Sequence, residues 1–163
     1  MQLVVALLLL YIMTDCKEYR LGDLGTVITG NTPSSKFPEE FGYEIPFVTP
    51  SDYKNYNKWI TFSERNLSGR GRDKLKSRIL KPRSILVTCI GSDMGKVAIN
   101  RIPVITNQQI NSIITNDLVD QDYLYYKLID LYDIIRMHGE AGTAVPIVNK
   151  TDFENIRIEI PIA

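Results

Sequence analysis

Short runs of apolar residues, each bounded by glycine, proline, asparagine or serine, extend along most of this chain. The clearest run, from Ile85 to Ile90, is β-branched and apolar, which predicts a buried strand. Gly91 and Gly95 follow it and bracket a turn at which glycine supplies positive φ where needed. The stretch therefore predicts a strand, a glycine turn and a second strand.

Other apolar runs predict further strands and the turns between them. The alternation of Ile156, Ile158 and Ile160 places one face of the last strand in the core. The remaining predicted strands are residues 18–21, 44–48, 58–62 and 110–115. Residues 21–28 are expected to form a brief helix or turn, residues 30–35 and 50–52 polar turns, and residues 67–81 a basic loop.

The strongest helical pattern extends from Gln121 to Met137. Its apolar residues recur at three- and four-residue spacing, and Asp120 or Asp122 can cap its start. Its tyrosines either pack into the core or offer stacking surfaces, and we favour packing. The sequence thus predicts an α+β fold: a mixed or antiparallel twisted sheet of short strands, one main helix and long loops.

Charge is unevenly distributed along the chain. The 163 residues have a formal net charge of zero, which alone argues against a nucleic-acid binder. Between Glu64 and Arg83, however, eight basic residues accompany two acidic ones, so this segment carries +6 and the rest of the chain −6. Such asymmetry is typical of a phosphate-binding surface, although a solvated charged loop has the same composition.

Known catalytic and metal-binding patterns are missing from the sequence. The segment from Gly91 to Lys96 is one residue short of a phosphate-binding P-loop, and Val97 stands where Ser or Thr would bind magnesium. A single histidine, His138, excludes a histidine-rich metal site. We therefore expect no catalytic residues, no metal and no cofactor. Cys89, inside the apolar strand, is expected to be a buried thiol.

The amino-terminal residues 1–16 form an apolar extension of uncertain status. The apolar run at residues 3–13 is too short to span a bilayer and lacks the flanks of a secretory signal. It is either a buried helix or strand or an upstream extension, with Met13 as the natural start. We expect a cytoplasmic protein with no membrane partner.

Several segments, taken in order, resemble one target recognition domain of the DNA specificity (S) subunit of type I restriction–modification systems. The resemblance covers about residues 17 to 161 and is specific through the order and spacing of its pieces. They are Tyr19 to Gly25, Thr29 to Pro33, Ile45 to Asp52, Ile85 to Thr88, Gly91 to Gly95, Thr106 to Gln109, Tyr123 to Tyr126, Gly142-Thr143 and Ile156 to Pro161.

The resemblance implies that residues 17–163 form a domain that recognises one half of a bipartite target in double-stranded DNA. Implied partners are an adenine methyltransferase (M) subunit that uses S-adenosylmethionine, a restriction motor-nuclease (R) subunit and a second recognition half. The spacer helix of the family would begin where this chain stops, at Ala163. The alternative is a truncated remnant that acts as a protein-interaction module.

The candidate DNA-binding residues combine phosphate-neutralising cations with side chains that can read bases. They are Arg65, Arg70, Arg72, Lys74, Lys76, Arg78, Ser92, Lys96, Asn107, Gln108 and Gln109. The Thr106-Asn107-Gln108-Gln109 cluster can instead tie a loop to backbone groups, and we favour this structural role. Sequence-specific contacts are then expected in the loops at residues 54–58 and 65–76.

Overall fold

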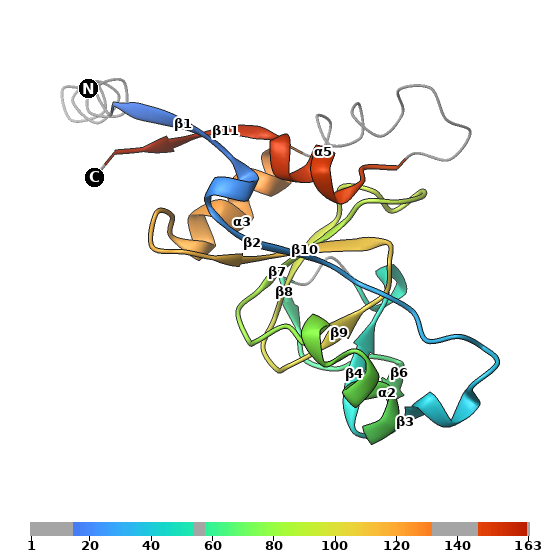
Figure 1. The fold of residues 1–163 in the computed structure, drawn as a ribbon. Helices are drawn as coiled ribbons and strands as arrows, with labels where there is room; N and C mark the ends of the chain where they lie inside the picture. Colours follow the sequence, from blue (N-terminus) through green and yellow to red (C-terminus); the bar gives the residue numbers. More distant parts are fainter. Residues whose placement is uncertain (1–14, 54–57, 132–146, 163) are drawn as a thin grey trace.

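The computed structural model describes residues 15–53, 58–131 and 147–162, and these residues have the predicted α+β architecture (Figure 1). Their strands form three sheets, of two, five and four strands. The two-stranded sheet pairs β1 (Cys16–Arg20) with β11 (Arg157–Pro161) in antiparallel register. In β11 the isoleucines at 158 and 160 are buried and their neighbours exposed, which confirms the predicted alternation.

The five-stranded sheet is the centre of the molecule. Its order is β2 (Gly25–Thr29), β10 (Ile110–Thr115), β7 (Ile85–Thr88), β8 (Val97–Asn100) and β5 (Trp59–Ile60). All four residues of β7 are buried, as its apolar composition predicts. β10 has the predicted bounds, and only the edge strand β5 runs parallel to its neighbour within this sheet.

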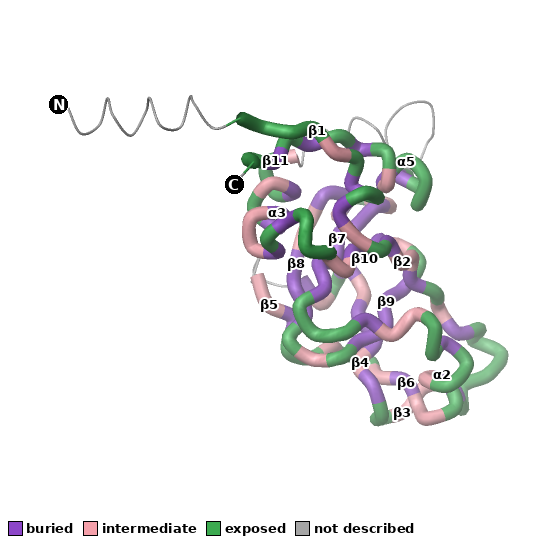
Figure 2. Tube along the Cα trace, turned by 60° about the vertical axis from the view of Figure 1, so that its left-hand side comes forward, coloured by how far each residue is buried: buried purple, intermediate pink, exposed green. Residues whose placement is uncertain are grey.

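Both faces of the five-stranded sheet are covered. On one face, α3 (Gln121–Asp130), α5 (Lys150–Asn155) and the β1–β11 ribbon pack over β7 and β10, with Leu124, Leu128 and Phe153 wholly buried. On the other face, a second cluster includes Leu86 and Ile110. Figure 2 shows the buried residues concentrated along the central strands, with exposed chain at β1. Each wholly buried leucine or isoleucine contributes about 2 kcal/mol.

A four-stranded sheet lies at the opposite end from the β1–β11 ribbon (Figure 1). Its order is β3 (Phe41–Gly42), β6 (Arg65–Leu67), β4 (Ile45–Val48) and β9 (Ile105–Thr106). Short 3-10 turns at Leu21–Asp23, Pro38–Glu40 and Pro50–Asp52 connect the strands. The last of these confirms the predicted polar turn at residues 50–52.

Two predicted turns or loops are wrong in part. Residues 25–29 form the edge strand β2, although the segment was expected to be a helix or turn. The basic loop predicted at residues 67–81 contains α2 (Gly69–Lys74) and a 3-10 turn at Lys76–Arg78. The Ser68 hydroxyl caps α2 by accepting a hydrogen bond from the Gly71 amide at 3.3 Å, a local bond that offsets the weak helix propensity of glycine.

The main helix begins where predicted but ends earlier. The Asp120 carboxylate accepts a hydrogen bond from the Tyr123 amide at 2.9 Å, so the predicted N-cap is confirmed. The helix ends at Asp130, with Leu131 as C-cap. Positions 132–137 and the amino-terminal run at residues 1–14 lie outside the described residues. Within the described part of the chain, no helix is long and apolar enough to cross a membrane.

The two larger sheets meet at Gly30 and the Thr106-Asn107 dipeptide. The Gly30 amide donates to the Ile110 carbonyl at 3.1 Å, and the Asn31 amide donates to the Thr106 carbonyl at 2.9 Å. From the other side, the Asn107 amide donates to the carbonyl of Val48 at 3.0 Å. These bonds join β2, β10, β9 and β4 at one place, so they fix how the two sheets are placed on each other.

Replacement of Gly30 tests this junction. A Cβ atom at position 30 would lie 2.0 Å from the Asn107 carbonyl oxygen and 2.4 Å from that of Thr106. Because these are backbone atoms, Gly30→Ala should lower the free energy of unfolding by about 2–3 kcal/mol, measured by urea denaturation. Gly69→Ala is the matched control, since its nearest atoms are 3.9 Å away and it lies in a helix. Equal stability of the two variants would contradict a close-packed junction.

The two cysteines differ in exposure, and the predicted burial of Cys89 is confirmed. Cys89 is buried and Cys16 is exposed. Burial raises the pKa of the Cys89 thiol to about 12. At mildly alkaline pH, a thiol-reactive reagent should therefore modify Cys16 in the native protein and both cysteines only in denaturant. Rapid modification of Cys89 in the native state, located by mass spectrometry, would show that this part of the core opens.

Candidate nucleic-acid interface

The six predicted phosphate contacts lie together at one end of the molecule. We name this end the basic lobe and define it as β3, β4, β6, β9, α2 and the turn Lys76–Arg78 (Figure 1). Arg65 lies on β6, three of the cations lie on α2, and the last two lie in the turn that follows it. The structure thus brings these six residues onto one lobe, as a contiguous basic segment requires.

Acidic residues from outside the basic segment neutralise part of this charge. They lie between residues 39 and 44, just before and after β3, and each pairs with a cation of α2. The pairs are Arg70–Glu39 at 3.2 Å, Arg72–Glu44 at 3.6 Å and Lys74–Glu40 at 2.7 Å. Asp73 also pairs with Arg72, at 3.0 Å. The net charge of +6 counted along the segment therefore overstates the charge that this surface offers to a phosphate.

Lys74 has a structural role. Glu40 is 2% exposed, and one of its carboxylate oxygens accepts the hydrogen bond from the Lys74 ammonium. The Glu40 carbonyl accepts a hydrogen bond from the Ser68 amide at 2.9 Å and closely faces Gly71. Because a buried carboxylate needs a charged donor, Lys74 is committed to holding α2 against residues 38–40.

Arg78 also has a partner inside the protein. Its guanidinium donates a hydrogen bond to the Thr29 carbonyl at the end of β2, which ties the turn to the five-stranded sheet. Arg65 lies over the ring of Phe41, at 4.3 Å from Cζ to the ring centroid, and Lys76 is exposed. Within the described part of the chain, neither Arg65 nor Lys76 has a carboxylate at ion-pair distance. These two are the cations best able to meet a phosphate or a base.

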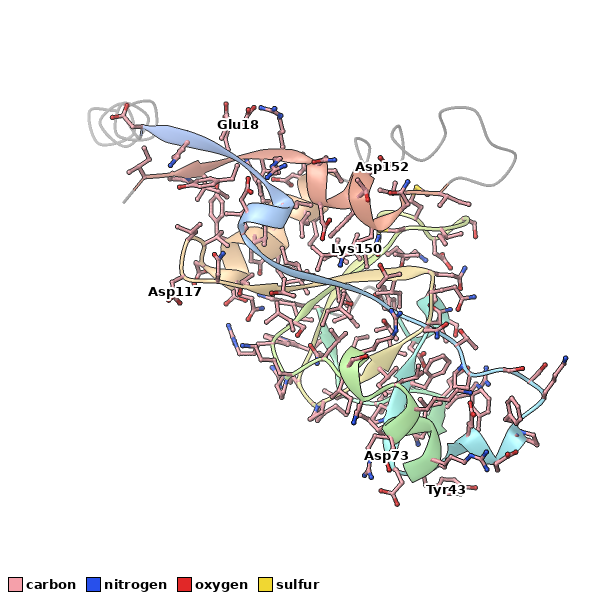
Figure 3. All side chains as sticks on the ribbon, viewed as in Figure 1. Glu18, Tyr43, Asp73, Asp117, Lys150 and Asp152 are labelled. Carbon is pink, nitrogen blue, oxygen red and sulfur yellow. The ribbon has the colours of Figure 1, made fainter. Side chains whose placement is uncertain are left out.

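Arg65 borders an open pocket that the sequence did not predict. The pocket has a volume of about 410 Å³ and is lined by Phe41, Gly42, Tyr43, Glu64, Arg65 and Asn66. Tyr43 is 97% exposed and projects at the outer end of the basic lobe (Figure 3). Arginine can read guanine bidentately, asparagine can read adenine, and an exposed aromatic ring can stack on a base.

Ser92 and Lys96 do not join this surface. They lie in the β7–β8 turn, where Gly91 and Gly95 have φ of 86° and 90°, which confirms the predicted positive φ. Lys96 pairs with Asp93 inside the turn, and Met94 is wholly buried beneath it. In Figure 1 this turn projects beside α5, well away from the basic lobe.

The amide cluster lies at the junction between the two sheets. The Asn107 side-chain amide donates to the Gln109 side chain at 2.8 Å, and the Gln109 backbone amide donates to the Asn107 side-chain oxygen at 3.2 Å. Gln108 is exposed and accepts a hydrogen bond from the Thr32 hydroxyl. Since Asn107 is 7% exposed, this geometry favours the structural role over base reading for Asn107 and Gln109.

The described residues contain no group of three or more His, Cys, Asp or Glu side chains that could hold a metal ion. His138 and most of residues 54–58, where specific contacts were also expected, lie outside the described residues. Of the two uncharged candidate readers in the pocket, Asn66 lies in the expected contact segment at residues 65–76, whereas nothing in the sequence indicated Tyr43. The exposure of Tyr43 next to the two-residue strand β3 depends on strand pairing that the sequence does not specify.

Comparison with known proteins identifies the family. The family described as type I restriction modification DNA specificity domain matches residues 13–163. The chain belongs to this family. It is 39% identical over 150 residues to the type I restriction enzyme MjaIX specificity subunit of Methanocaldococcus jannaschii, with 90% of this chain and 34% of the relative covered. It is 35% identical over 143 residues to the HindI specificity subunit of Haemophilus influenzae, covering 86% and 31%.

Solved structures of this kind share the fold. The HsdS subunit from Thermoanaerobacter tengcongensis superposes with a TM-score of 0.67 at 17% identity, over 90% of this chain and 33% of that one. The S subunit from M. genitalium gives a TM-score of 0.56 at 16% identity, over 91% and 35%. The chain thus spans about a third of the length of the specificity subunits that it matches.

Substitution of neighbouring lysines separates structural charge from available charge. Lys74→Met leaves the buried Glu40 carboxylate without its donor and should lower the free energy of unfolding by about 1–3 kcal/mol. Lys76→Met, the matched control, removes an exposed cation and should change stability by less than about 0.5 kcal/mol. Urea denaturation of both variants measures the difference. A stability loss in Lys76→Met equal to that in Lys74→Met would refute the assignment.

Proposed function

We propose that this domain recognises one half of a bipartite target in double-stranded DNA and that it does so without catalysing a reaction. The observation that carries this proposal is the Arg65 pocket at the outer end of the basic lobe. It combines an arginine that lacks a carboxylate partner within the described residues, an exposed tyrosine and an asparagine around one open volume. Membership of the DNA specificity family supports the same function.

The roles within the lobe divide by exposure and pairing. We assign phosphate contact to Lys76 and base reading to Arg65 and Asn66, because these side chains have room to meet DNA. Arg70 and Arg72 must first release their carboxylate partners to bind a phosphate, so each contributes less binding free energy than an unpaired cation. Lys74 and Arg78 hold the lobe in place.

The proposed partners follow from the relatives. Those relatives are specificity subunits of type I restriction enzymes. One solved structure with a similar fold, at a TM-score of 0.69, is described in terms of complex assembly of the type I R-M system. We propose that this domain acts beside a second recognition half, with an adenine methyltransferase (M) subunit and a motor-nuclease (R) subunit in the same complex. A cytoplasmic location is part of this proposal.

A fluorescence-anisotropy titration with a labelled random-sequence duplex at low salt tests DNA binding. We expect salt-dependent binding that is weakened equally for all sequences by Lys76→Gln, with the salt slope reduced by about 1. Selection of bound duplexes from the random pool should yield a preferred half-site. Arg65→Gln should reduce affinity for that half-site by about 1–3 kcal/mol and affect random duplexes less.

Arg157→Gln is the matched control, because Arg157 is an exposed arginine on the β1–β11 ribbon that pairs with Glu18. It should bind DNA as the unchanged protein does. Absence of salt-dependent binding by the unchanged protein would overturn the proposed function. Equal losses in Arg65→Gln and Arg157→Gln would overturn the assignment of the pocket.

A further inference from the structure

The only tryptophan of the chain, Trp59, lies among three cationic side chains outside the Arg65 pocket; one of them, Lys58, ends the expected contact segment at residues 54–58. Its ring centroid is 4.4 Å from the Arg101 guanidinium carbon, 5.3 Å from the Lys58 ammonium and 6.0 Å from the Arg83 guanidinium carbon. Lys58 also lies over the rings of Tyr125 and Tyr126, at 4.8 and 4.7 Å. We name Lys58, Trp59, Arg83 and Arg101 the tryptophan cluster.

Backbone pairing builds this cluster from three separate segments. β5 lies at the edge of the five-stranded sheet beside β8, between α3 and the four-stranded sheet (Figure 2). The Ile99 amide donates to the Lys58 carbonyl at 2.7 Å, and the Arg101 amide donates to the Ile60 carbonyl at 2.9 Å. These bonds set Arg101 beside Trp59.

Arg83 is held in the cluster by a buried asparagine. The Arg83 amide donates to the Asn100 carbonyl at 2.7 Å, and the next amide, of Ser84, donates to the Asn100 side-chain oxygen at 2.8 Å. The Asn100 side-chain amide in turn donates to the Lys81 carbonyl at 2.9 Å. Arg83 has a φ of 69°, an uncommon conformation for a residue with a side chain. The fold therefore fixes the turn that presents this arginine, despite its local cost.

The cluster has more positive than negative charge. Asp122 pairs with Lys58 at 2.9 Å and with Arg83 at 3.8 Å, and the hydrogen bond to Lys58 lowers the pKa of this carboxyl. Among the residues that the structure describes, no carboxylate pairs with Arg101. Three cations therefore face one carboxylate. The more exposed of the two ion pairs, Arg83–Asp122, can break so that Arg83 binds a competing anion.

The chemistry of the cluster suits a phosphodiester backbone. A guanidinium stacked on an indole ring keeps its in-plane N–H donors available, in the fork geometry that matches phosphate oxygens. A run of cations also connects the two regions in sequence: Lys76 and Arg78 in the basic lobe, then Lys81 and Arg83. Exposed cations spread over several segments fit an extended chain of phosphates better than they fit one small anion.

We propose that the tryptophan cluster is a second DNA contact, at which Arg101 and Arg83 bind the sugar–phosphate backbone of the duplex whose bases meet the Arg65 pocket. This inference rests on the proposed function and adds a site to it. The cluster would position the duplex and contribute affinity for every sequence, whereas the pocket contributes selectivity.

Trp59 is an intrinsic probe of this contact. In one titration of the full chain with a labelled random duplex, anisotropy reports binding and tryptophan emission reports the cluster. We expect both signals to change with the same midpoint. Arg101→Gln should weaken binding about five- to tenfold at low salt and reduce the slope of log K against log salt by about 1. Arg157→Gln should leave affinity, slope and the emission change as they are.

The outcomes separate this site from the proposed function. If the duplex binds, Arg65→Gln or Lys76→Gln weakens it, and Arg101→Gln binds like Arg157→Gln, the second contact is refuted and the proposed function stands. If the unchanged protein binds no duplex, both fail. Polyglutamate is the competing probe: if it changes Trp59 emission at the same charge concentration as the duplex, the cluster fits any acidic chain and the assignment to phosphodiesters is refuted. Urea denaturation of Arg101→Gln checks that the variant is folded.

Discussion

The contact of Gly30 with the Thr106-Asn107 backbone is the constraint on which the rest of the structure depends. β9 and β10 belong to different sheets, yet only Asn107, Gln108 and Gln109 separate them in the chain. The sheets can lie at one fixed angle only if this short connection is held from both sides. Gly30 permits the close approach on one side, and the hydrogen bond to Val48 holds the other. This junction places β4 and β9 relative to the core, and the hydrogen bond from Arg78 to the Thr29 carbonyl adds a second tie for the basic lobe.

Much of the frame could be predicted from the sequence because its signals are local. A β-branched run buried on both faces indicates β7, and an aspartate before a leucine-periodic segment indicates the start of α3. The glycines at 91 and 95 likewise have the positive φ that a tight turn requires. Such features are decided within about ten residues of chain, so composition and spacing are enough.

The helix α2 could not be predicted because its stability comes from tertiary contacts. The sequence Gly-Arg-Gly-Arg has weak helix propensity, and two glycines in four residues indicate a loop. Gly71 is needed because its backbone packs against the Glu40 carbonyl, and Lys74 is held by the buried carboxylate of the same residue. Both contacts join segments about 30 residues apart, and no local sequence pattern predicts them.

The charge of the site differs from the charge counted along the sequence for a related reason. A count along the chain assigns each cation its full charge, whereas the fold brings the carboxylates of residues 39–44 to α2 and that of Asp122 to Lys58. A phosphate competes with these partners, so cations that lack a carboxylate partner among the described residues, such as Arg65 and Arg101, matter more than their number suggests. The positive potential of a surface therefore depends on which of its cations are ion-paired, and only the folded chain determines that pairing.

The basic lobe combines a fixed set of paired strands with pocket side chains that can differ from one protein to another. The strands of the basic lobe are held by main-chain hydrogen bonds and by buried residues such as Phe47 and Leu67. Around the pocket, Tyr43 is almost fully exposed and contributes little to that core, whereas Arg65 covers the core from outside by lying over the rings of Phe41 and Phe47. Replacing them changes the chemistry offered to a base without changing strand register. A domain built in this way can change the bases that it recognises while the junction that positions its pocket stays the same.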